Sequence, residues 1–545
     1  MKRRLIQLLI VIVCVLGLIL ASGFVASSLV SGSGKQMVVA SLASSLGVPV
    51  TVGEANFDLV QWFLLRPAIA IHDIAIGNPP GYHSQHLLEA SKLSAQVALL
   101  PLLHKSVEVH SIEIERPRIF AETNAQGVSN IEALLRKARG KPTSGPASTG
   151  SGSTSIVVDE FSLTSGEVAW AEPGRAGENF NISGIDIHMQ DLAIDRPCRL
   201  QFGAQFFGGS VSRIRLAAQA GPFTADALPL SGTVSLTIAP AEIPAALRRA
   251  QFGDLLAAPG KAAKVSIEAT VRGDVYQRLT GPAKLVLKDI LIGKDEKHVL
   301  PLAGDAPVTF TATKLVSSPA FQLNIANARL KLGKGEWLGD AELQLHGTAT
   351  SGRSSGKLRN VDINELVSSV TSANGKIYGV LEMPSYSLQF AGNNAQQARN
   401  SLHGAGKLSV TQGRIAALDL LDKIEHPERM LSKQGDTPFT TLAANLAVSQ
   451  EKLNLDGIAL DSPALRITGQ GYIGFDQALN LALAAHLSGG ASTLVSRTGV
   501  GGQGGGIPLT VTGTVESPQV RPAVGKMVES VAGGLLDSFF KKKSK

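Results

Sequence analysis

A regular alternation of apolar and polar side chains runs through most of this chain. In Val107–Glu115, apolar residues occupy every second position, apart from one phase shift at Ser111. A period of two is typical of a β-strand that has one apolar face and one polar face. We therefore expect strands to dominate from Val107 to Val520. The same pattern recurs in Gly232–Ile238, Val265–Gly273, Lys284–Lys288, Phe321–Ile325, Ala341–Gly347, Ala464–Gly469 and Ala478–Leu483.

Turn-forming residues are spread among these alternating segments. The chain has 57 glycines and 26 prolines, some of them in pairs such as Asn374-Gly375, Ser462-Pro463 and Ser517-Pro518. Such pairs favour turns, so we expect frequent turns between short strands. The spacing of apolar residues in Gln36–Leu46 predicts one short helix that ends at Gly47. The predicted fold class is mainly β, with an antiparallel-rich sheet and few short helices.

An uncharged, apolar segment near the N-terminus predicts a transmembrane helix. No charged residue occurs from Leu5 to Val30, and a spanning helix needs about 20 mainly apolar residues. Lys2, Arg3 and Arg4 precede the segment, and positive charges favour the cytoplasmic side of a membrane. We therefore expect the N-terminus in the cytoplasm and the rest of the chain across the membrane. A cleaved signal peptide is the alternative, with cleavage near Ala21–Gly23, but its apolar core would span only about 7 to 15 residues.

Two internal segments lack strand periodicity. Gly140–Ser155 consists almost entirely of Gly, Pro, Ser and Thr, which predicts a flexible linker between an N-terminal unit and the main sheet. Gly489–Gly506 is rich in glycine and predicts a mobile loop between two strands. Near the C-terminus, Val524–Phe540 predicts an amphipathic helix with a basic end. The predicted segments are a transmembrane anchor (1–30), an N-terminal domain (31–139), the linker (140–155), a middle β-sheet region (156–400), a C-terminal domain (401–522) and an amphipathic helix with a basic tail (523–545).

The net charge of +7 does not indicate a nucleic-acid partner. Translocation would remove the chain from nucleic acid, and several of the basic residues lie in the C-terminal tail. We expect these charges to aid solubility or to attract anionic lipid head groups weakly. Of the two cysteines, Cys14 lies in the predicted anchor and Cys198 in the exported part. A disulfide between them is therefore not expected.

Catalytic motifs are missing from the sequence. It contains no HExxH, CxxC, GxSxG or phosphate-binding loop pattern. His83 and His86 have a spacing that can bind metal on a helix, but they follow the turn-forming segment Gly77–Gly81, so we expect an exposed loop. Asp461-Ser462-Pro463 lacks a histidine partner nearby and predicts a turn at a strand entry. We therefore predict no catalytic residue, no cofactor, no metal site and no enzymatic activity.

Short motifs near both ends of the chain resemble a known family. The N-terminal set is GNPPG at Gly77–Gly81, LLPLL at Leu99–Leu103, and IEIERPR at Ile112–Arg118 followed by Gly127 and Asn130. The C-terminal set is Gly435–Phe439, Leu460–Pro463, Gly469–Gly471, Ile507-Pro508, Gly513-Thr514 and Ser517–Val520. In order and spacing these sets resemble the AsmA family of inner-membrane-anchored proteins from Gram-negative bacteria, over Ser31–Arg139 and Ser401–Pro522. A glycine-rich insertion before Ile507 departs from the family pattern.

The resemblance implies a fold and a cellular place. It implies an elongated, curved β-sheet groove with an apolar inner face, similar to bridge-like lipid transfer proteins. It further implies a single-pass protein of the bacterial inner membrane, with most of its chain in the periplasm, that supports outer-membrane lipid homeostasis. Because the family has no catalytic motif, the resemblance implies no catalytic residue.

The apolar face of a long alternating sheet is the predicted functional surface. Such a face must be covered, either by a second sheet or by a ligand. With only 5% aromatic residues, the lining consists mainly of Leu, Ile, Val and Ala, which suits acyl chains and equally a closed sandwich. The candidate groove residues are Leu323, Ile325, Val234, Leu236, Leu479, Leu481 and Leu483.

These observations predict a non-enzymatic groove for lipid binding or lipid transfer. The expected partners are a phospholipid or another acyl lipid, the inner membrane, and a protein of the outer membrane or the periplasm. The alternative is an assembly or scaffolding factor for outer-membrane proteins, because an exposed sheet edge can accept a partner strand.

Overall fold

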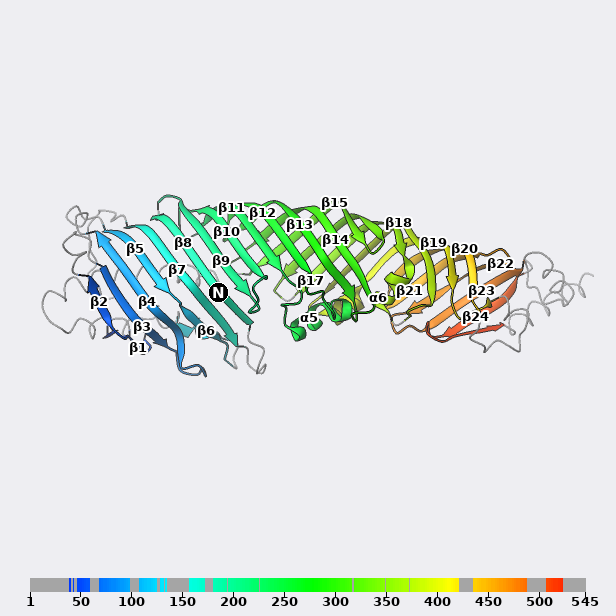
Figure 1. The fold of residues 1–545 in the computed structure, drawn as a ribbon, viewed down its shortest axis with the longest axis horizontal. Helices are drawn as coiled ribbons and strands as arrows, with labels where there is room; N and C mark the ends of the chain where they lie inside the picture. The colour runs from blue at the N-terminus through cyan, green and yellow to red at the C-terminus, as the bar shows by residue number, and fades with distance from the viewer. Residues whose placement is uncertain are drawn as a thin grey trace, which may run out of the picture. The chain divides into compact units, whose positions relative to one another are not determined.

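The computed structural model describes residues 39–40, 43, 47–58, 68–98, 107–124, 128–131, 133–134, 156–171, 180–193, 195–224, 226–315, 318–347, 349–371, 373–420, 435–487 and 506–522. They form a mainly β, antiparallel-rich fold with a few short helices (Figure 1), which confirms the predicted fold class at this level. The predicted anchor (1–30), linker (140–155) and tail (523–545) lie outside these residues. In the described part of the chain, no helix combines the length and the apolar character needed to cross a membrane.

The chain divides into two compact units. Unit 1 comprises Met1–Glu242, Ser266–Lys284 and Thr309–Phe321, and unit 2 comprises Ile243–Val265, Leu285–Val308 and Gln322–Lys545. The domain bounds expected from the sequence stay a prediction. Four strands contribute residues to both units: β12 (Lys264–Asp274), β13 (Arg278–Gly293), β14 (Val299–Thr313) and β15 (Ala320–Leu332).

In unit 1, two short strands share the edge of a longer one. β1 (Val50–Thr51) and β2 (Ala55–Asp58) pair with different parts of β3 (Ala68–Gly77). The strands that follow are β4 (His86–Ala98), β5 (Val107–Glu115), β6 (Arg118–Glu122), β7 (Ile156–Ala171), β8 (Phe180–Ala193), β9 (Cys198–Phe206), β10 (Arg213–Ala220) and β11 (Pro229–Ile238). Both β5 and β6 run parallel to β7, so the strands on either side of the predicted linker pair directly with each other.

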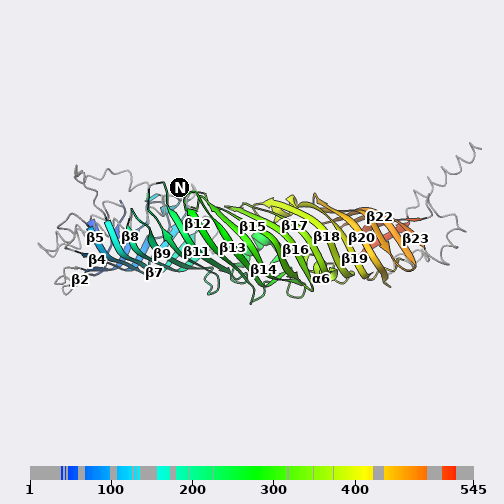
Figure 2. The ribbon, with the colours of Figure 1, turned by 90° about the horizontal axis from the view of Figure 1, so that it is seen from above.

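In unit 2, consecutive strands form an antiparallel meander (Figure 2). These strands are β16 (Gly335–His346), β17 (Ala349–Asp362), β18 (Ile377–Gly392), β19 (His403–Ile415), β20 (Thr437–Ser449), β21 (Lys452–Asp461), β22 (Leu465–Gly474), β23 (Leu479–Leu487), β24 (Ile507–Gly513) and β25 (Pro518–Pro522). Its described helices are α5 (Ala245–Phe252), the 3₁₀ turn η2 (Gly253–Leu255), α6 (Ile363–Val370) and α7 (Ala395–Ser401). Helix α6 begins after Asp362, whose carboxylate accepts the backbone N–H groups of Asn364 and Glu365.

Each strand predicted from the alternating pattern is found, but the expectation of short strands was wrong. β7 and β13 each contain 16 residues. Several glycines lie inside strands, among them Gly232, which the alternating pattern predicts in the strand Gly232–Ile238. Gly232 in β11 pairs with Ala218 of β10, and a Cβ atom at this glycine would lie 2.2 Å from the carbonyl oxygen of Ala217. Glycine therefore permits a close approach of two strands here.

The predicted turns and the first helix are reproduced where they are described. Ser462 and Leu465 exchange backbone hydrogen bonds between β21 and β22, as the predicted strand-entry turn requires. Within the predicted helix Gln36–Leu46, residues 39, 40 and 43 are helical and the others lie outside the described residues. Gly47 has a φ of 68° and donates its backbone N–H to the carbonyl of Ala43, which confirms it as the end of this helix.

Buried apolar side chains gather in both units. In unit 1, one cluster includes Ile112 and Phe161, and a second includes Val271. In unit 2, Val361 and Val410 are completely buried. Full burial of such side chains stabilises a fold by roughly 1.5–3 kcal/mol each. Because the alternate side chains of each strand face the solvent, these clusters lie on one face of the sheet.

Carboxylates on neighbouring strands stabilise several β-bulges. At the register shifts beside Ser165 and Asn360, and at Asn327, a residue with positive φ donates its backbone N–H to an acidic side chain of the next strand. A bulge leaves this N–H without a partner in the sheet, so the carboxylate replaces the missing hydrogen bond. The bonds are Ser165 N to Asp186 Oδ1 (2.9 Å), Asn327 N to Asp340 Oδ1 (2.8 Å) and Asn360 N to Glu382 Oε1 (2.9 Å).

Candidate functional site

Apolar side chains form two continuous rows across the strands of unit 1. Each member lies directly opposite the next one in the register of the sheet. The first row contains Ile71, Leu93, Ile114, Leu163, Ile187, Phe202, Leu216 and Val234, from β3 to β11. The second row contains Ala95, Ile112, Phe161, Met189, Leu200 and Ala218. We call the surface formed by these two rows the apolar face of unit 1.

The exposure of this face changes along the first row. Ile71 is 2% exposed and Leu163 is 7% exposed, whereas Ile114 between them is partly buried. From β8 onward all side chains of the first row are partly buried, including Phe202, Leu216 and Val234. The row contains no charged residue. Leu216 and Val234 pack in part against a buried cluster, so an apolar ligand could contact only the part of their surface that stays exposed.

Two of the predicted groove residues belong to this region. Val234 is the last member of the first row, and Leu236 pairs with Ile214 two positions further along β11. Both side chains are partly buried. The sequence analysis missed Phe202 and Leu216, although β9 and β10 show the same alternation. The register that aligns them with Val234 is a property of the folded sheet.

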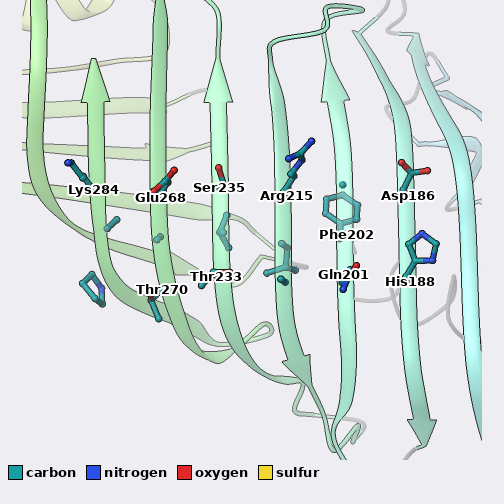
Figure 3. Close-up of a pocket in the computed structure, with 17 residues that line it drawn as sticks. Asp186, His188, Gln201, Phe202, Arg215, Thr233, Ser235, Glu268, Thr270 and Lys284 are labelled. Atoms are coloured by element: carbon teal, nitrogen blue, oxygen red, sulfur yellow. The ribbon is translucent and has the colours of Figure 1, made fainter. Parts of the chain in front are cut away.

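One depression in unit 1 has a volume of about 900 Å³, and its lining includes Phe202, Leu216 and Val234 of the first row. Figure 3 shows polar side chains of the same lining, Asp186, His188, Arg215, Glu268 and Lys284. All five of these polar side chains are exposed. Among the described residues, no group of three His, Cys, Asp or Glu side chains is arranged to hold a metal ion.

The other predicted groove residues lie in unit 2, on two separate strands. Leu323 and Ile325 are partly buried side chains of β15. Ile325 lines a smaller depression of about 350 Å³, together with Ala341 and Leu388. The remaining candidates are Leu479, Leu481 and Leu483 on β23.

Two leucines of β23 lie opposite glycines of the neighbouring strand β22. Leu481 pairs with Gly471 and Leu483 pairs with Gly469. The Cδ2 atom of Leu483 lies 2.7 Å from the position that a Cβ atom would take at Gly469. On β24, the partner of Leu483 is Leu509, which is 2% exposed. These leucines are partly buried and pack against the core of unit 2, as Val234 on β11 packs against a buried cluster of unit 1.

A small polar cluster interrupts the apolar side of unit 2. The hydroxyl group of Tyr386 accepts a hydrogen bond from Nε1 of Trp337 and lies 2.7 Å from Oγ of Ser354. The alternation of β16, β17 and β18 places all three side chains on the same face. Their polar groups bond to one another, which lowers the cost of placing them beside apolar side chains. Sequence reasoning missed this cluster because its members are widely separated in the chain.

The predicted loop around His83 is held by a buried carboxylate. Glu122 is 7% exposed and accepts the backbone N–H groups of His83 (2.8 Å) and Ser84 (3.0 Å). Its Oε1 atom also lies 2.5 Å from Nδ1 of His83. Burial alone would raise the pKa of Glu122, but the hydrogen bonds from Ser84 and His83 outweigh it and lower the pKa to about 2. His86, at the start of β4, contacts Glu89 at 2.8 Å.

A fully buried amide continues this network. Asn130 is 0% exposed and donates its side-chain N–H₂ to Asn78 Oδ1 (2.8 Å) and to the carbonyl of Phe120 (2.7 Å). Its Oδ1 atom accepts the backbone N–H of Glu122 at 3.0 Å. The motif at Gly77–Gly81 and the later Asn130 are thus joined in one structure. This network orders a connection of the sheet.

Comparison with protein families agrees with these N-terminal features. Residues 5–195 match the model of the AsmA family. Over this range the chain is similar to the AsmA family. The match covers the Glu122 network and the strands from β1 to β8. The AsmA-like motifs at Ser401–Pro522 lie beyond the matched residues and stay a prediction. No curated protein sequence and no solved structure matches the chain.

Proposed function

We propose that this protein binds the acyl chains of phospholipids or of other lipids on the apolar face of unit 1. The observation that carries the proposal is one row of uncharged, partly exposed side chains that lie opposite one another on neighbouring strands. This row consists of Ile187, Phe202, Leu216 and Val234. A lipid-transport or outer-membrane role is consistent with the family. We further propose that the protein acts without catalysis.

The energetics of this surface suit a lipid that must be held and released. The four side chains span three strand spacings, or about 14 Å. Transfer of a methylene group from water to an apolar surface is worth roughly 0.8 kcal/mol. Burial of about five methylenes would then contribute about 4 kcal/mol. An open face of this kind gives weak, non-directional binding, which allows a chain to move along the row.

The same proposal covers the location of the protein in the cell. The uncharged segment Leu5–Val30 would anchor the chain in the inner membrane, with the sheet in the periplasm. The sheet would form an elongated, curved groove that receives lipid from this membrane. The predicted candidates Leu323 and Ile325 would contact lipid in unit 2. In this way the protein would support lipid homeostasis of the outer membrane.

Adjacent residues on β10 provide a matched test. Leu216 belongs to the apolar face, whereas the exposed Arg215 belongs to the opposite face. A photoreactive phenylalanine analogue would replace either residue in the full chain, in cells, before mass spectrometry of the irradiated protein. The expected result is a lipid adduct at position 216 and none at position 215. Equal labelling at both positions, or no lipid at position 216, would refute acyl-chain binding on this face.

The scaffolding alternative depends on a sheet edge that is open to a partner strand. β25 pairs with β24 and is the last described strand of the chain. It has only five residues, with Pro518 and Pro522 at its ends. Proline cannot donate to a strand ladder, so this edge is a poor template for a partner strand. Recovery of outer-membrane barrel proteins with the purified chain, without lipid, would favour the alternative.

A further inference from the structure

Exposed apolar side chains gather on short helices of unit 2. Leu247 and Phe252 of α5 are 37% and 44% exposed, and Leu255 of η2 is 50% exposed. Helix α6 contacts η2, and its last residue, Val370, is 52% exposed. We call these four side chains the helical patch. The segments that carry it are far apart in the sequence and meet only in the folded unit.

The helical patch is distinct from the apolar face of the strands. Among the described residues, Val286 on β13 is the one other large apolar side chain with comparable exposure, at 36%. Helix α5 has no buried residue, so core packing does not explain its apolar side chains. An apolar patch that a soluble fold does not use for its own core marks an interaction surface.

The segment that carries α5 and η2 has a positive net charge, whereas α6 contains the acidic Glu365. The segment Ile243–Val265 contains four basic residues and a single acidic residue, Asp254. Arg249 on α5 and Lys261 after η2 are both exposed, and neither forms an ion pair with a described residue. Exposed Leu and Phe side chains beside Arg and Lys are typical of short helices that lie in the interface of an anionic bilayer.

We propose that the helical patch binds the surface of a membrane that contains anionic lipids. The size of the patch favours a bilayer over a protein partner. Its four side chains expose on the order of 400 Å², whereas a stable protein interface buries about 800 Å² on each partner. A bilayer needs no complementary surface, because each side chain enters the head-group region independently. The basic residues Arg249 and Lys261 would attract the patch to anionic head groups.

This contact is separate from lipid binding on the apolar face. It concerns helices of unit 2 and the outside of a bilayer, and it holds whether or not the strands carry acyl chains. It would give the protein a second membrane contact besides the predicted N-terminal anchor. Two weak membrane contacts on one chain strengthen each other, because the first raises the local concentration of the second.

Flotation with two kinds of vesicle tests the proposal. The full chain is held in a phosphatidylcholine nanodisc and mixed with vesicles of phosphatidylcholine, alone or with phosphatidylglycerol. We expect it to float with the mixed vesicles only, and added salt should reduce this binding. The double variant Phe252→Asp/Leu255→Asp and the single variant Arg249→Glu should each bind at least tenfold more weakly.

The controls separate membrane binding from other effects. Val286→Asp changes a comparably exposed apolar side chain outside the patch and should float like the wild type. Circular dichroism checks that each variant is folded, which is expected because all of these positions are exposed. Equal flotation with both kinds of vesicle, wild-type binding by the double variant, or no wild-type binding overturns the proposal. So does a change of oligomeric state in the double variant, since it would assign the patch to a protein interface.

Discussion

Replacement of Glu122 by Gln should weaken the N-terminal part of the sheet in a pH-dependent way. The carboxylate has a pKa of about 2 in the folded chain and an ordinary value of 4.5. Because the folded value is the lower one, the carboxylate stabilises the fold above pH 4.5, and this contribution is lost as the pH falls from about 4.5 to 2. At about 1.4 kcal/mol for each pKa unit, the full contribution is about 3 kcal/mol.

Hydrogen exchange of the backbone amides of His83 and Ser84 is the appropriate assay, because a chain of this size need not unfold in one step. At pH 7, Glu122→Gln should lower the free energy of local opening by about 3 kcal/mol, since the carboxamide directs its own N–H₂ group at backbone donors. The difference from the wild type should shrink between pH 4.5 and 2. Glu89→Gln, at an exposed contact with His86, is the control and should change opening by less than about 1 kcal/mol.

The reasoning would be refuted if the wild type and Glu122→Gln had the same opening free energy at pH 7. It would also be refuted if their difference did not depend on pH below 4.5. A global loss of structure in the variant would show in circular dichroism, and exchange in the strands of unit 2 would then rise as well. Unchanged exchange in unit 2 would place the effect at the Glu122 network.

Three further predictions concern stability, measured as the urea dependence of circular dichroism and of hydrogen exchange. Leu465→Ala, at a side chain that is 1% exposed, should lower the free energy of unfolding by about 2–5 kcal/mol. Leu247→Ala, at an exposed side chain of α5, should lower it by less than about 0.5 kcal/mol. Equal losses of stability would contradict the assigned burial. Asp340→Ala should cost about 1–3 kcal/mol because it leaves the backbone N–H of Asn327 without its acceptor, and Asp340→Asn should restore much of this loss. Gly469→Ala should raise exchange along β22 and β23, since the new Cβ would lie 2.3 Å from the carbonyl oxygen of Ala482; normal exchange there would show that the strands can separate without cost.

Local pattern was sufficient to find the strands but not their lengths. The segment predicted at Val107–Glu115 matches β5 in both bounds, and the register shift against β4 falls at His110, beside the predicted phase shift at Ser111. A strand with one buried face must alternate, so this signal is carried by each strand alone. A glycine in the sequence does not by itself show whether its position lies in a strand or in a turn. For Gly232, the sequence gives no sign of the strand that lies close beside it.

The sequence identified Val234 and Leu236 as apolar positions of an alternating strand. Val234 is a member of the first row, and the role of both residues in lipid binding stays a prediction. Phe202 and Leu216 complete the row because the register brings them opposite Val234. Bulges such as the one at Ser165 shift this register by one residue, and their positions depend on contacts with the next strand.

The apolar and polar periodicity of the sequence by itself determined that this protein is mainly β and that its sheet has one apolar face. Only the tertiary structure decided which part of that face is covered and which part is open. Ile71 and Phe202 occupy the same row and have equally apolar side chains, yet one is buried and the other is partly exposed. Exposure depends on what packs above a side chain, and that is set by segments distant in sequence. The Glu122 network and the helical patch could not be predicted from the sequence for the same reason, because both join residues that are neighbours only in space.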